Sequence, residues 1–434
     1  MHSPSRALSR IPHVQRNFVV NVLDGAVFAF GMSLASRSTV LPLFVQKMGG
    51  GNLAIGLLPV LWTLGFNLPQ VFVANYARQA PSKKRFVLIT GLIQRLPWLV
   101  IAVVTFFLLG TLPAPVALAL FFFLFASAAV GGSLNLPGWF DLVAKLTPVR
   151  LRGRLFAWRA VLGAIFGMGA GWVVAVVLHR FEAPQSFAYL FGLAFCVTMV
   201  SYAILAQIKE VAPRLPPLRI RHREFLRGLP RILATDRNYR NFLIGDALLI
   251  AALMADAFFA VHAIERFGLS EGYVGYFIIV MTASAAVGSL LFGYVADRIG
   301  HRLNLVIASG MTVLACVTAL VAPGPAVYMV VFVGASLSMG LPMISRLPIV
   351  AELCSEEDRP TYIALTNALT APFAMSGLLA GWLANQFGYD AVFVCATVIA
   401  TAAGVWFLTM VPEPRSKDFR IHRTQTGGDT LGRT

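Results

Sequence analysis

Charged residues are scarce in this sequence. Asp, Glu, Lys and Arg together make up 12% of the 434 residues, whereas soluble domains carry roughly 25%. Apolar residues make up 58%, and the mean hydropathy is +0.75. A water-soluble chain of this length does not bury that much apolar surface in its cores. The composition therefore excludes an ordinary soluble protein and predicts that a lipid bilayer surrounds most of the chain.

Several patterns that carry chemistry are also missing. The four cysteines are far apart and form no C-x-x-C pair, so neither a disulfide framework nor a zinc site is expected. The sequence has no G-x-x-x-x-G-K-[ST] motif for nucleotide phosphates and no H-E-x-x-H motif. We therefore expect no metal, no cofactor and no enzyme activity. The net charge of +16 does not indicate nucleic acid, because the basic residues lie between apolar runs rather than on one domain.

Twelve apolar runs are long enough to cross a bilayer, which takes about 20 helical residues. The predicted spans are 18–46, 53–77, 86–109, 116–140, 156–178, 187–208, 241–264, 273–294, 303–322, 326–347, 361–384 and 390–410. Most connections are short, but residues 209–240 form a long, Arg-rich connection after the sixth span. The sequence therefore predicts an all-α integral membrane protein with twelve transmembrane helices.

The basic residues lie mainly on one side of the predicted membrane. With both termini in the cytoplasm, the opposite loops contain only Lys47, Arg180 and Arg266 of the 35 Lys and Arg residues. This asymmetry follows the positive-inside rule, and an odd number of spans would remove it. It predicts a multi-pass protein of the cell membrane, plasma or inner, with both termini cytoplasmic.

The two halves of the chain resemble each other. Residues 143–157 align without gaps on residues 350–364, and Asp24 and Asp246 lie in corresponding parts of the first and seventh spans. Repeats of this kind indicate a duplicated architecture. The predicted parts are an N-terminal six-helix bundle (1–208), a cytoplasmic linker (209–240), and a C-terminal six-helix bundle with a short cytoplasmic tail (241–434).

The connection between the eighth and ninth spans reads GYVADRIGHR. Its notable residues are Gly293, Asp297, Arg298, Gly300 and Arg302. This stretch resembles the G-x-x-x-D-R-x-G-x-R loop signature of the major facilitator superfamily, and it lies in a short loop between two spans of the second half. The resemblance covers the whole chain through its spans, its repeat and its long central connection. It implies the major facilitator fold, with two pseudo-symmetric six-helix bundles, and solute transport.

The resemblance also implies contacts between the halves on the cytoplasmic side. In that fold the loop after the eighth span faces the start of the fifth, so Asp297 is expected near Arg152 and Arg154. The loop after the second span faces the start of the eleventh, and the two surfaces here have opposite charge. Their residues are Lys83, Lys84 and Arg85 on one side and Glu356 and Glu357 on the other. Together with the loop signature they form a predicted cytoplasmic gate. The alternative is that the basic residues only orient the chain in the membrane and the acidic residues only interact with solvent.

A few polar and charged residues lie inside the predicted spans, where a charge costs roughly 2.5–3.5 kcal/mol at the bilayer centre. The predicted candidates for binding substrate or protons are Asp24, Asn21, Arg95, Asp246 and Asp256. Opposite charges that face one cavity can bind a solute, or pair until a solute or a proton displaces one partner. Two alternatives stay open: Asp246 can also dock the start of its helix, and Arg37 can also extend to the outer interface.

The sequence thus predicts a secondary active transporter that moves a small solute by alternating access. A gradient, with a proton gradient as the default, is the expected driving force because no nucleotide site is visible. The alternative is a protein of the same fold without solute transport, either a ligand sensor or a lipid-handling protein. Expected partners are a small-molecule substrate, the lipid bilayer and protons, with no nucleic acid, and the protein is expected to be a monomer. The sequence indicates neither the substrate nor the direction of transport.

Overall fold

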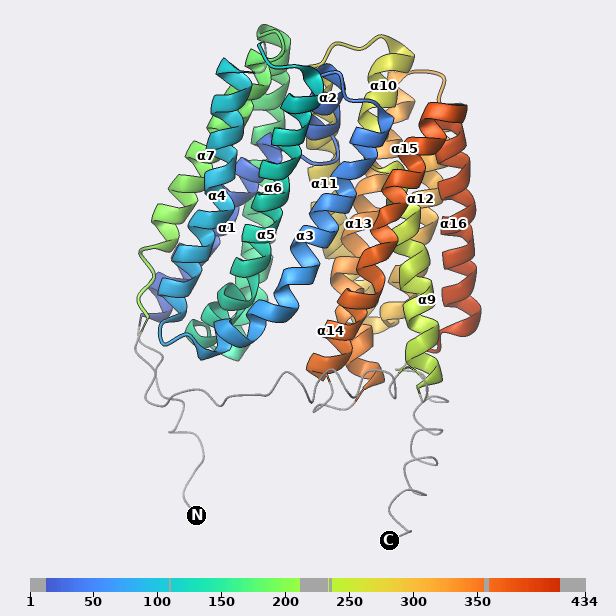
Figure 1. Cartoon of the computed structure of the whole chain (residues 1–434). Coiled ribbons are helices and arrows are strands. Elements are labelled where there is room, and N and C mark those ends of the chain that lie inside the picture. The colour runs from blue at the N-terminus through green and yellow to red at the C-terminus, as the bar shows by residue number, and fades with distance from the viewer. Residues whose placement is uncertain (1–12, 109–110, 211–232, 234–235, 355–358, 414–434) are drawn as a thin grey trace, which may run out of the picture. The chain divides into compact units, whose positions relative to one another are not determined.

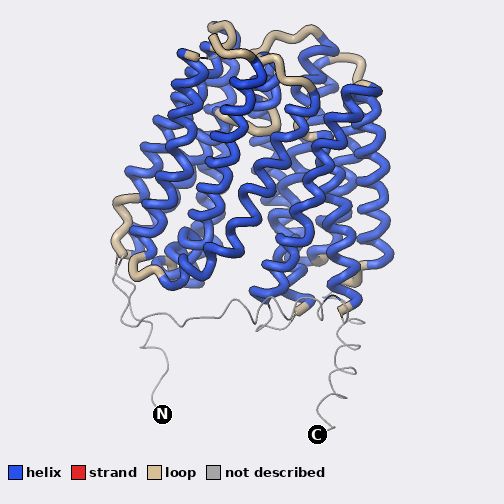
Figure 2. Tube along the Cα trace, in the orientation of Figure 1, coloured by secondary structure: helices blue, strands red, loops and turns tan. Residues whose placement is uncertain are grey.

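The computed structural model shows helices and connecting turns, without strands, in the residues that it describes (Figure 2). The described residues are 13–108, 111–210, 233, 236–354 and 359–413. In this part of the chain, 11 helical segments have the length and apolar composition needed to cross a membrane. The predicted eleventh span is built of three shorter helical pieces instead. The prediction of an all-α membrane protein is confirmed.

The helices fall into two compact units (Figure 1). The first unit contains α1 (Val14–Leu34), α4 (Lys83–Phe107), α5 (Ala114–Leu146), α6 (Val149–Arg180), α7 (Gln185–Leu205) and the part of α3 (Asn52–Gln79) that begins at Leu68. The second unit contains α2 (Val40–Lys47), the earlier part of α3, α9 (Arg237–Ala252), η2 (Leu253–Ala255), α10 (Phe259–Phe267), α11 (Tyr273–Arg298), α12 (His301–Val321), α13 (Pro325–Leu353), α14 (Arg359–Thr370), η3 (Ala371–Met375), α15 (Ser376–Phe387) and α16 (Tyr389–Met410). Residues Arg37–Asn67 thus pack within the second unit, while the predicted division of the chain at 209–240 stays a prediction.

The same helix packings occur in both units. In the first unit α4 packs against α5 and α7, and α1 packs against α6 and α7. In the second unit α12 packs against α13 and α16, and α9 packs against α16 and against the α14–η3 segment. Numbered by predicted span, the packed pairs of the first half are 3–4, 3–6, 1–6 and 1–5. Adding six to each number gives the packed pairs of the second half, which are 9–10, 9–12, 7–12 and 7–11. The internal repeat in the sequence therefore corresponds to a repeat in packing.

Large apolar side chains lie both inside the units and on their surfaces. In the second unit Phe242 and Phe407 are fully buried and pack in one core cluster. On the surfaces Phe123 is 71% exposed and Leu290 is 67% exposed. Water would disfavour such exposed apolar surface, whereas lipid chains solvate it at no cost. The distribution fits helices that are surrounded by a bilayer.

Three of the predicted spans are interrupted within the second unit or where the chain enters it. The first span breaks at residues 35–39, the seventh at 253–258 and the eleventh at 371–375. Pro372 explains the third break, because a proline inside a helix removes a backbone hydrogen bond and its ring clashes with the preceding turn. The other two breaks contain no proline, and their sequences did not reveal them.

Glycines allow α3 and α15 to approach each other closely in the second unit. A Cβ atom on Gly56 would lie 2.9 Å from the carbonyl carbon of Gly377 and 3.3 Å from the amide nitrogen of Gly381. Gly377 and Gly381 are spaced as in the small-xxx-small pattern that brings membrane helices into backbone contact. This contact fixes the first half of α3 against the segment that follows the break in the eleventh span.

We expect Gly56→Ala to lower the thermal unfolding midpoint of the purified protein, because the added methyl group must push two backbones apart. Overpacking of this kind costs about 1–3 kcal/mol. Gly310→Ala in α12 is the matched control, because nothing lies within 4 Å of a Cβ placed there. Intrinsic tryptophan fluorescence during heating measures both midpoints. Equal midpoints for the two variants would contradict the close packing.

Candidate functional site

Asp24 lies in α1 and is 4% exposed. Its Oδ1 atom accepts a hydrogen bond of 2.7 Å from the Ser201 hydroxyl on α7. Its Oδ2 atom lies 3.3 Å from Nη1 of Arg159 on α6. The predicted candidate Asp24 is therefore one half of an ion pair that joins three helices of the first unit. Neither Ser201 nor Arg159 is among the site residues predicted from the sequence.

Arg95 on α4 is also 4% exposed, but it does not contact Asp24 directly. Its Nε donates to the Thr198 carbonyl at 2.8 Å and its Nη1 to the Gly91 carbonyl at 2.9 Å. Its Nη2 donates to the Ser201 hydroxyl at 3.3 Å, so Ser201 links the two predicted candidates. This cluster contains the guanidinium groups of Arg95 and Arg159 with only one carboxylate, and its net charge is positive.

Asn21 and Gly25 shape the surroundings of the Asp24–Arg159 pair. The side chain of Asn21 donates to the Asn17 carbonyl at 2.9 Å, and its own Oδ1 is buried with no hydrogen-bond partner among the described residues. The backbone carbonyl of Asn21 accepts a hydrogen bond from Arg159. A Cβ on Gly25 would lie 2.6 Å from Nε of Arg159, so the glycine leaves the space that the guanidinium occupies.

Asp246 on α9 forms a tighter pair in the second unit. Its oxygens lie 2.9 Å and 2.7 Å from Nε of Arg346 on α13, and it is 1% exposed. The other guanidinium nitrogens of Arg346 donate to Asn367 at 2.9 Å and to Thr370 at 2.6 Å, both on α14. The pair therefore joins three helices, and each nitrogen of the Arg346 guanidinium makes a hydrogen bond.

Asp256 lies apart from the other candidates, in the break between η2 and α10. Its Oδ2 atom accepts a hydrogen bond of 2.5 Å from Ser38 in the break between α1 and α2. Its Oδ1 atom is buried and has no hydrogen-bond partner in the part of the chain that the structure describes. The structure thus separates the predicted candidates into three places: a cluster around Asp24, the Asp246 pair, and Asp256.

The loop signature after α11 makes its described contacts within the second unit. Gly300 has a φ of 123°, a backbone conformation that favours glycine. The backbone nitrogen of Arg302 donates to Glu413 at 3.0 Å, and its guanidinium donates to the Val411 carbonyl at 3.1 Å. Arg298 lies over the ring of Tyr294 at 4.8 Å. These contacts explain the glycine and the second arginine of the signature as a tie between α12 and the end of α16.

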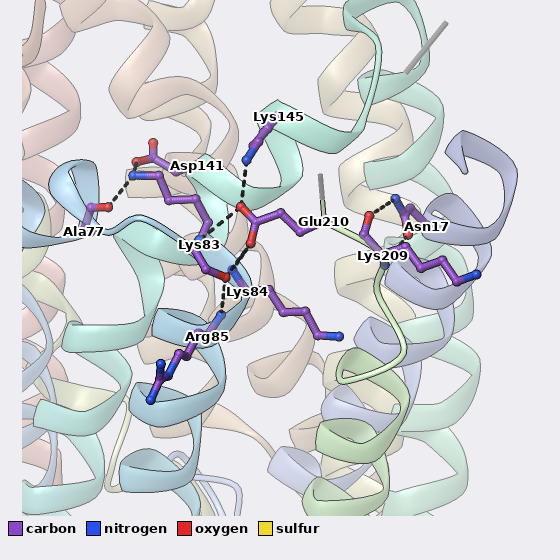
Figure 3. Close-up of polar contacts among 10 residues, drawn as sticks. Asn17, Ala77, Lys83, Lys84, Arg85, Asp141, Lys145, Lys209 and Glu210 are labelled. Carbon is purple, nitrogen blue, oxygen red and sulfur yellow. Dashed lines mark hydrogen bonds and ion pairs between the residues drawn. The ribbon is translucent and has the colours of Figure 1, made fainter. Parts of the chain in front are cut away.

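The basic residues at the start of α4 make contacts in their own unit (Figure 3). The carboxylate of Glu210, just after α7, accepts hydrogen bonds from the backbone nitrogens of Lys83 at 3.1 Å and Lys84 at 2.8 Å. It also accepts one from Ser82 at 2.8 Å and forms a 2.8 Å ion pair with Lys145 at the end of α5. A carboxylate at this place satisfies free amides of a helix N-terminus and is favoured by the helix dipole.

The other predicted gate residues of the first unit are placed as follows. Lys83 lies 3.6 Å from Asp141, and Arg152 donates to the carbonyls of Ala144 at 2.6 Å and Thr147 at 3.2 Å. Arg85 donates through its backbone to Ser82, and Arg154 lies in α6 with its side chain exposed. Glu356 and Glu357 lie outside the described residues. The predicted gate between the halves therefore stays a prediction.

We expect Glu210→Gln to destabilise the first unit at neutral pH by about 2 kcal/mol, the scale of hydrogen bonds to a charged group. Burial alone would raise the pKa of Glu210, but hydrogen bonds from Lys145, the Lys84 amide, Ser82 and the Lys83 amide outweigh it and lower the pKa below its ordinary 4.5. A lowered pKa means that this stabilisation is present above pH 4.5 and is lost as pH falls through the folded-state value.

Thermal unfolding of wild type and Glu210→Gln from pH 7 to pH 4 measures this effect. The difference between their thermal unfolding midpoints should be largest at pH 7 and should become smaller below pH 4.5. Lys47→Gln is the control, because it removes an ion pair with Glu271 in the second unit that is partly exposed to solvent. A gap that is constant over this pH range would contradict the assigned charge of Glu210.

Comparisons with solved structures identify the fold. A mutant form of the nucleoside transporter NupG matches with a TM-score of 0.69 and 12% identity, covering 92% of this chain and 100% of that chain. A D-xylose–proton symporter matches with a TM-score of 0.68 and 16% identity, covering 93% and 99%. A bacterial homologue of the iron transporter ferroportin, in an inward-facing state, matches with a TM-score of 0.66 and 15% identity, covering 91% and 98%. The fold is therefore that of membrane solute transporters.

Part of the chain also resembles a known family in sequence. Residues 247–426 match the family model described as Major Facilitator Superfamily. No curated protein sequence gives a match. The match covers the larger part of the second half of the chain, and the fold of the whole chain is that of the major facilitator superfamily. The resemblance indicated by the loop signature and the fold that it implies are confirmed.

Proposed function

We propose that this protein is a secondary active transporter that carries a small solute by alternating access and is driven by a proton gradient. The two units rock around a site near the middle of the membrane, as the repeats of such transporters do. Both termini and the linker 209–240 lie on the cytoplasmic side, and the protein works as a monomer in the cell membrane. The predicted cytoplasmic gate closes one side during this cycle.

The geometry of the Asp24–Arg159 pair carries the proposal. Both residues lie about 15 Å from the start of their helices, close to the middle of a bilayer whose apolar core is about 30 Å thick. Their 3.3 Å contact is longer than the roughly 2.7–2.9 Å of a charge-assisted hydrogen bond. A pair with so long a contact can exchange its guanidinium for a proton.

Asp246 is less suited to this exchange. Arg346 contacts both of its oxygens at 2.9 Å or less, and the same guanidinium is held by Asn367 and Thr370. Opening that pair would leave several buried polar groups without partners, which costs free energy for each group. We therefore assign Asp24 to proton binding and the Asp246–Arg346 pair to holding the second unit together.

The substrate is a small solute, and transporters of similar fold define the first compounds to test. Two of the similar structures are described as a nucleoside transporter and a D-xylose–proton symporter. Purified protein in proteoliposomes, with and without an imposed pH gradient, should take up at least one labelled solute from a panel of nucleosides, pentoses and amino acids. The gradient should raise the accumulated amount above equilibration. If no solute moves while ligands still bind, the sensor or lipid-handling function replaces this proposal.

A further inference from the structure

A small cavity lies within the second unit, where three interrupted spans come together. Its volume is about 90 Å³. Residues from the breaks in the first, seventh and eleventh spans line it, and α3 and α13 complete the wall. The polar residues that matter here are Arg37, Ser38, Asp256 and Ser376. Interrupted helices that meet inside a bundle are a common framework for binding sites in transporters.

Two buried polar atoms on the cavity wall have no partner within the described residues. These are Oδ1 of Asp256 and the hydroxyl oxygen of Ser376. The other oxygen of Asp256 is fixed by the Ser38 hydroxyl at 2.5 Å, so the carboxylate has a defined orientation. A buried polar group without a hydrogen bond costs free energy. The arrangement therefore calls for a ligand that donates hydrogen bonds to Asp256.

Arg37 supplies the opposite charge to the same cavity. Its guanidinium lies over the indole ring of Trp62 at 4.9 Å, and the residue is exposed. Asp256 attracts it electrostatically, yet no described residue holds it in an ion pair or a hydrogen bond. The contact with Trp62 places the guanidinium at the cavity, and the alternative that Arg37 extends to the outer interface stays a prediction. Its N–H donors are thus available to an anionic group.

The rest of the wall is apolar except for Thr63. Trp62, Leu253, Met254 and Met339 surround the charged groups. A cavity of about 150 Å³ holds a benzene molecule, so the present one, at 90 Å³, admits a group of only a few non-hydrogen atoms. The size suits two small charged groups joined by one carbon atom and a short apolar side chain.

The geometry points to a binding site for a small amino-acid zwitterion, with the carboxylate on Arg37 and the ammonium group between Asp256 Oδ1 and Ser376. A simple cation would be repelled by Arg37, and a simple anion would be repelled by Asp256. A neutral polyol would form hydrogen bonds but would leave the charges of Arg37 and Asp256 without a counter-charge. This inference rests on the proposed transport function, for which it names the substrate class.

Binding of L-alanine to the purified full-length protein tests the site. Isothermal titration should detect L-alanine, while propionate, which lacks the ammonium group, and ethylamine, which lacks the carboxylate, should each bind at least about tenfold more weakly. D-xylose and uridine represent the neutral alternatives and should also bind at least tenfold more weakly. Equal or tighter binding of propionate, ethylamine or either neutral compound would overturn the assignment. So would the absence of binding by L-alanine.

Variants locate the binding in this cavity. Arg37→Gln should weaken L-alanine binding about tenfold or more but should not weaken ethylamine binding, because the repulsion of a cation by Arg37 is removed. Asp256→Asn should likewise weaken L-alanine binding but should not weaken propionate binding. Lys47→Gln, whose ion pair with Glu271 lies outside the cavity, should bind as wild type. If a variant does not fold, the ligand series on the wild-type protein still tests whether the site prefers a zwitterion. Wild-type affinity in both folded cavity variants would place the site elsewhere.

Failure of this inference is distinguishable from failure of the transport function. Proteoliposome uptake driven by a pH gradient is measured in parallel with binding. Uptake of a sugar or nucleoside without L-alanine binding would overturn the zwitterion site and keep the transporter. L-alanine binding that depends on Arg37 and Asp256, without any flux, would keep the site and overturn the transporter.

Discussion

Replacing Asp24 by asparagine is expected to abolish accumulation of solute against its gradient while leaving solute exchange intact. Asparagine has nearly the same shape and can still accept the hydrogen bond from Ser201, but it cannot bind and release a proton. With one proton moved per solute, a difference of about 2 pH units supports an accumulation ratio of about 100. In Asp24→Asn that ratio should fall to about 1. Uptake into proteoliposomes with an imposed pH gradient measures it.

Exchange of labelled for unlabelled solute across the same membrane is the internal control, because exchange needs no net proton movement. Gly25→Ala is a second variant, since its methyl group must displace the Arg159 guanidinium from Asp24. It should alter the pH at which transport is half-maximal without changing the thermal midpoint much. Full accumulation by Asp24→Asn would contradict the role assigned to this carboxylate.

Replacing Asp246, which corresponds to Asp24 in the second unit, by asparagine should have a different effect from Asp24→Asn. Asp246→Asn leaves the guanidinium of Arg346 without the buried carboxylate of Asp246, and removing one partner of a buried pair costs up to about 3–5 kcal/mol. The thermal unfolding midpoint should therefore fall strongly, whereas Asp24→Asn should change it little, because Arg159 keeps the Asn21 carbonyl and the face of Trp139. Thermal unfolding of both purified variants measures the contrast.

A double replacement distinguishes the effect of an unpaired charge from the effect of altered side-chain packing. Asp246→Leu combined with Arg346→Met removes both charges, so no uncompensated ion stays in the interior and part of the stability should return. Lys47→Gln removes a more exposed pair, which typically contributes at most about 1 kcal/mol, and should change the midpoint little. Equal destabilisation by Asp24→Asn and Asp246→Asn would contradict the division of roles between the two carboxylates.

The sequence predicts the helical framework well because length and hydropathy alone determine which segments can cross a bilayer. It does not predict where spans break. The interruption at Pro372 has a local cause, whereas residues 35–39 and 253–258 depart from the helix without a proline. The packing of Arg37–Asn67 within the second unit also has no local signal, because it depends on the backbone contact of Gly56 with Gly377.

The site was predictable in its acidic residues but not in their partners. Asp24 and Asp246 stand out as carboxylates inside spans, and both lie in buried ion pairs. Arg159 is 135 positions from Asp24 in the sequence, and nothing local indicates that α6 presents it to α1. The repeat offers one clue in retrospect. When the gapless alignment of 143–157 with 350–364 is extended, Arg346 corresponds to Trp139, on whose ring Arg159 stacks at 4.7 Å. The guanidinium therefore reaches an equivalent carboxylate from a different span in each half.

The movement of protons with solute tests the central claim most directly. A pH-sensitive dye trapped in proteoliposomes reports the internal pH when a transported solute is added without an imposed gradient. The proposed function predicts a pH change that depends on the solute, disappears in Asp24→Asn and is abolished by a protonophore. Solute flux at the wild-type rate with no change in internal pH would contradict proton-driven transport by this protein.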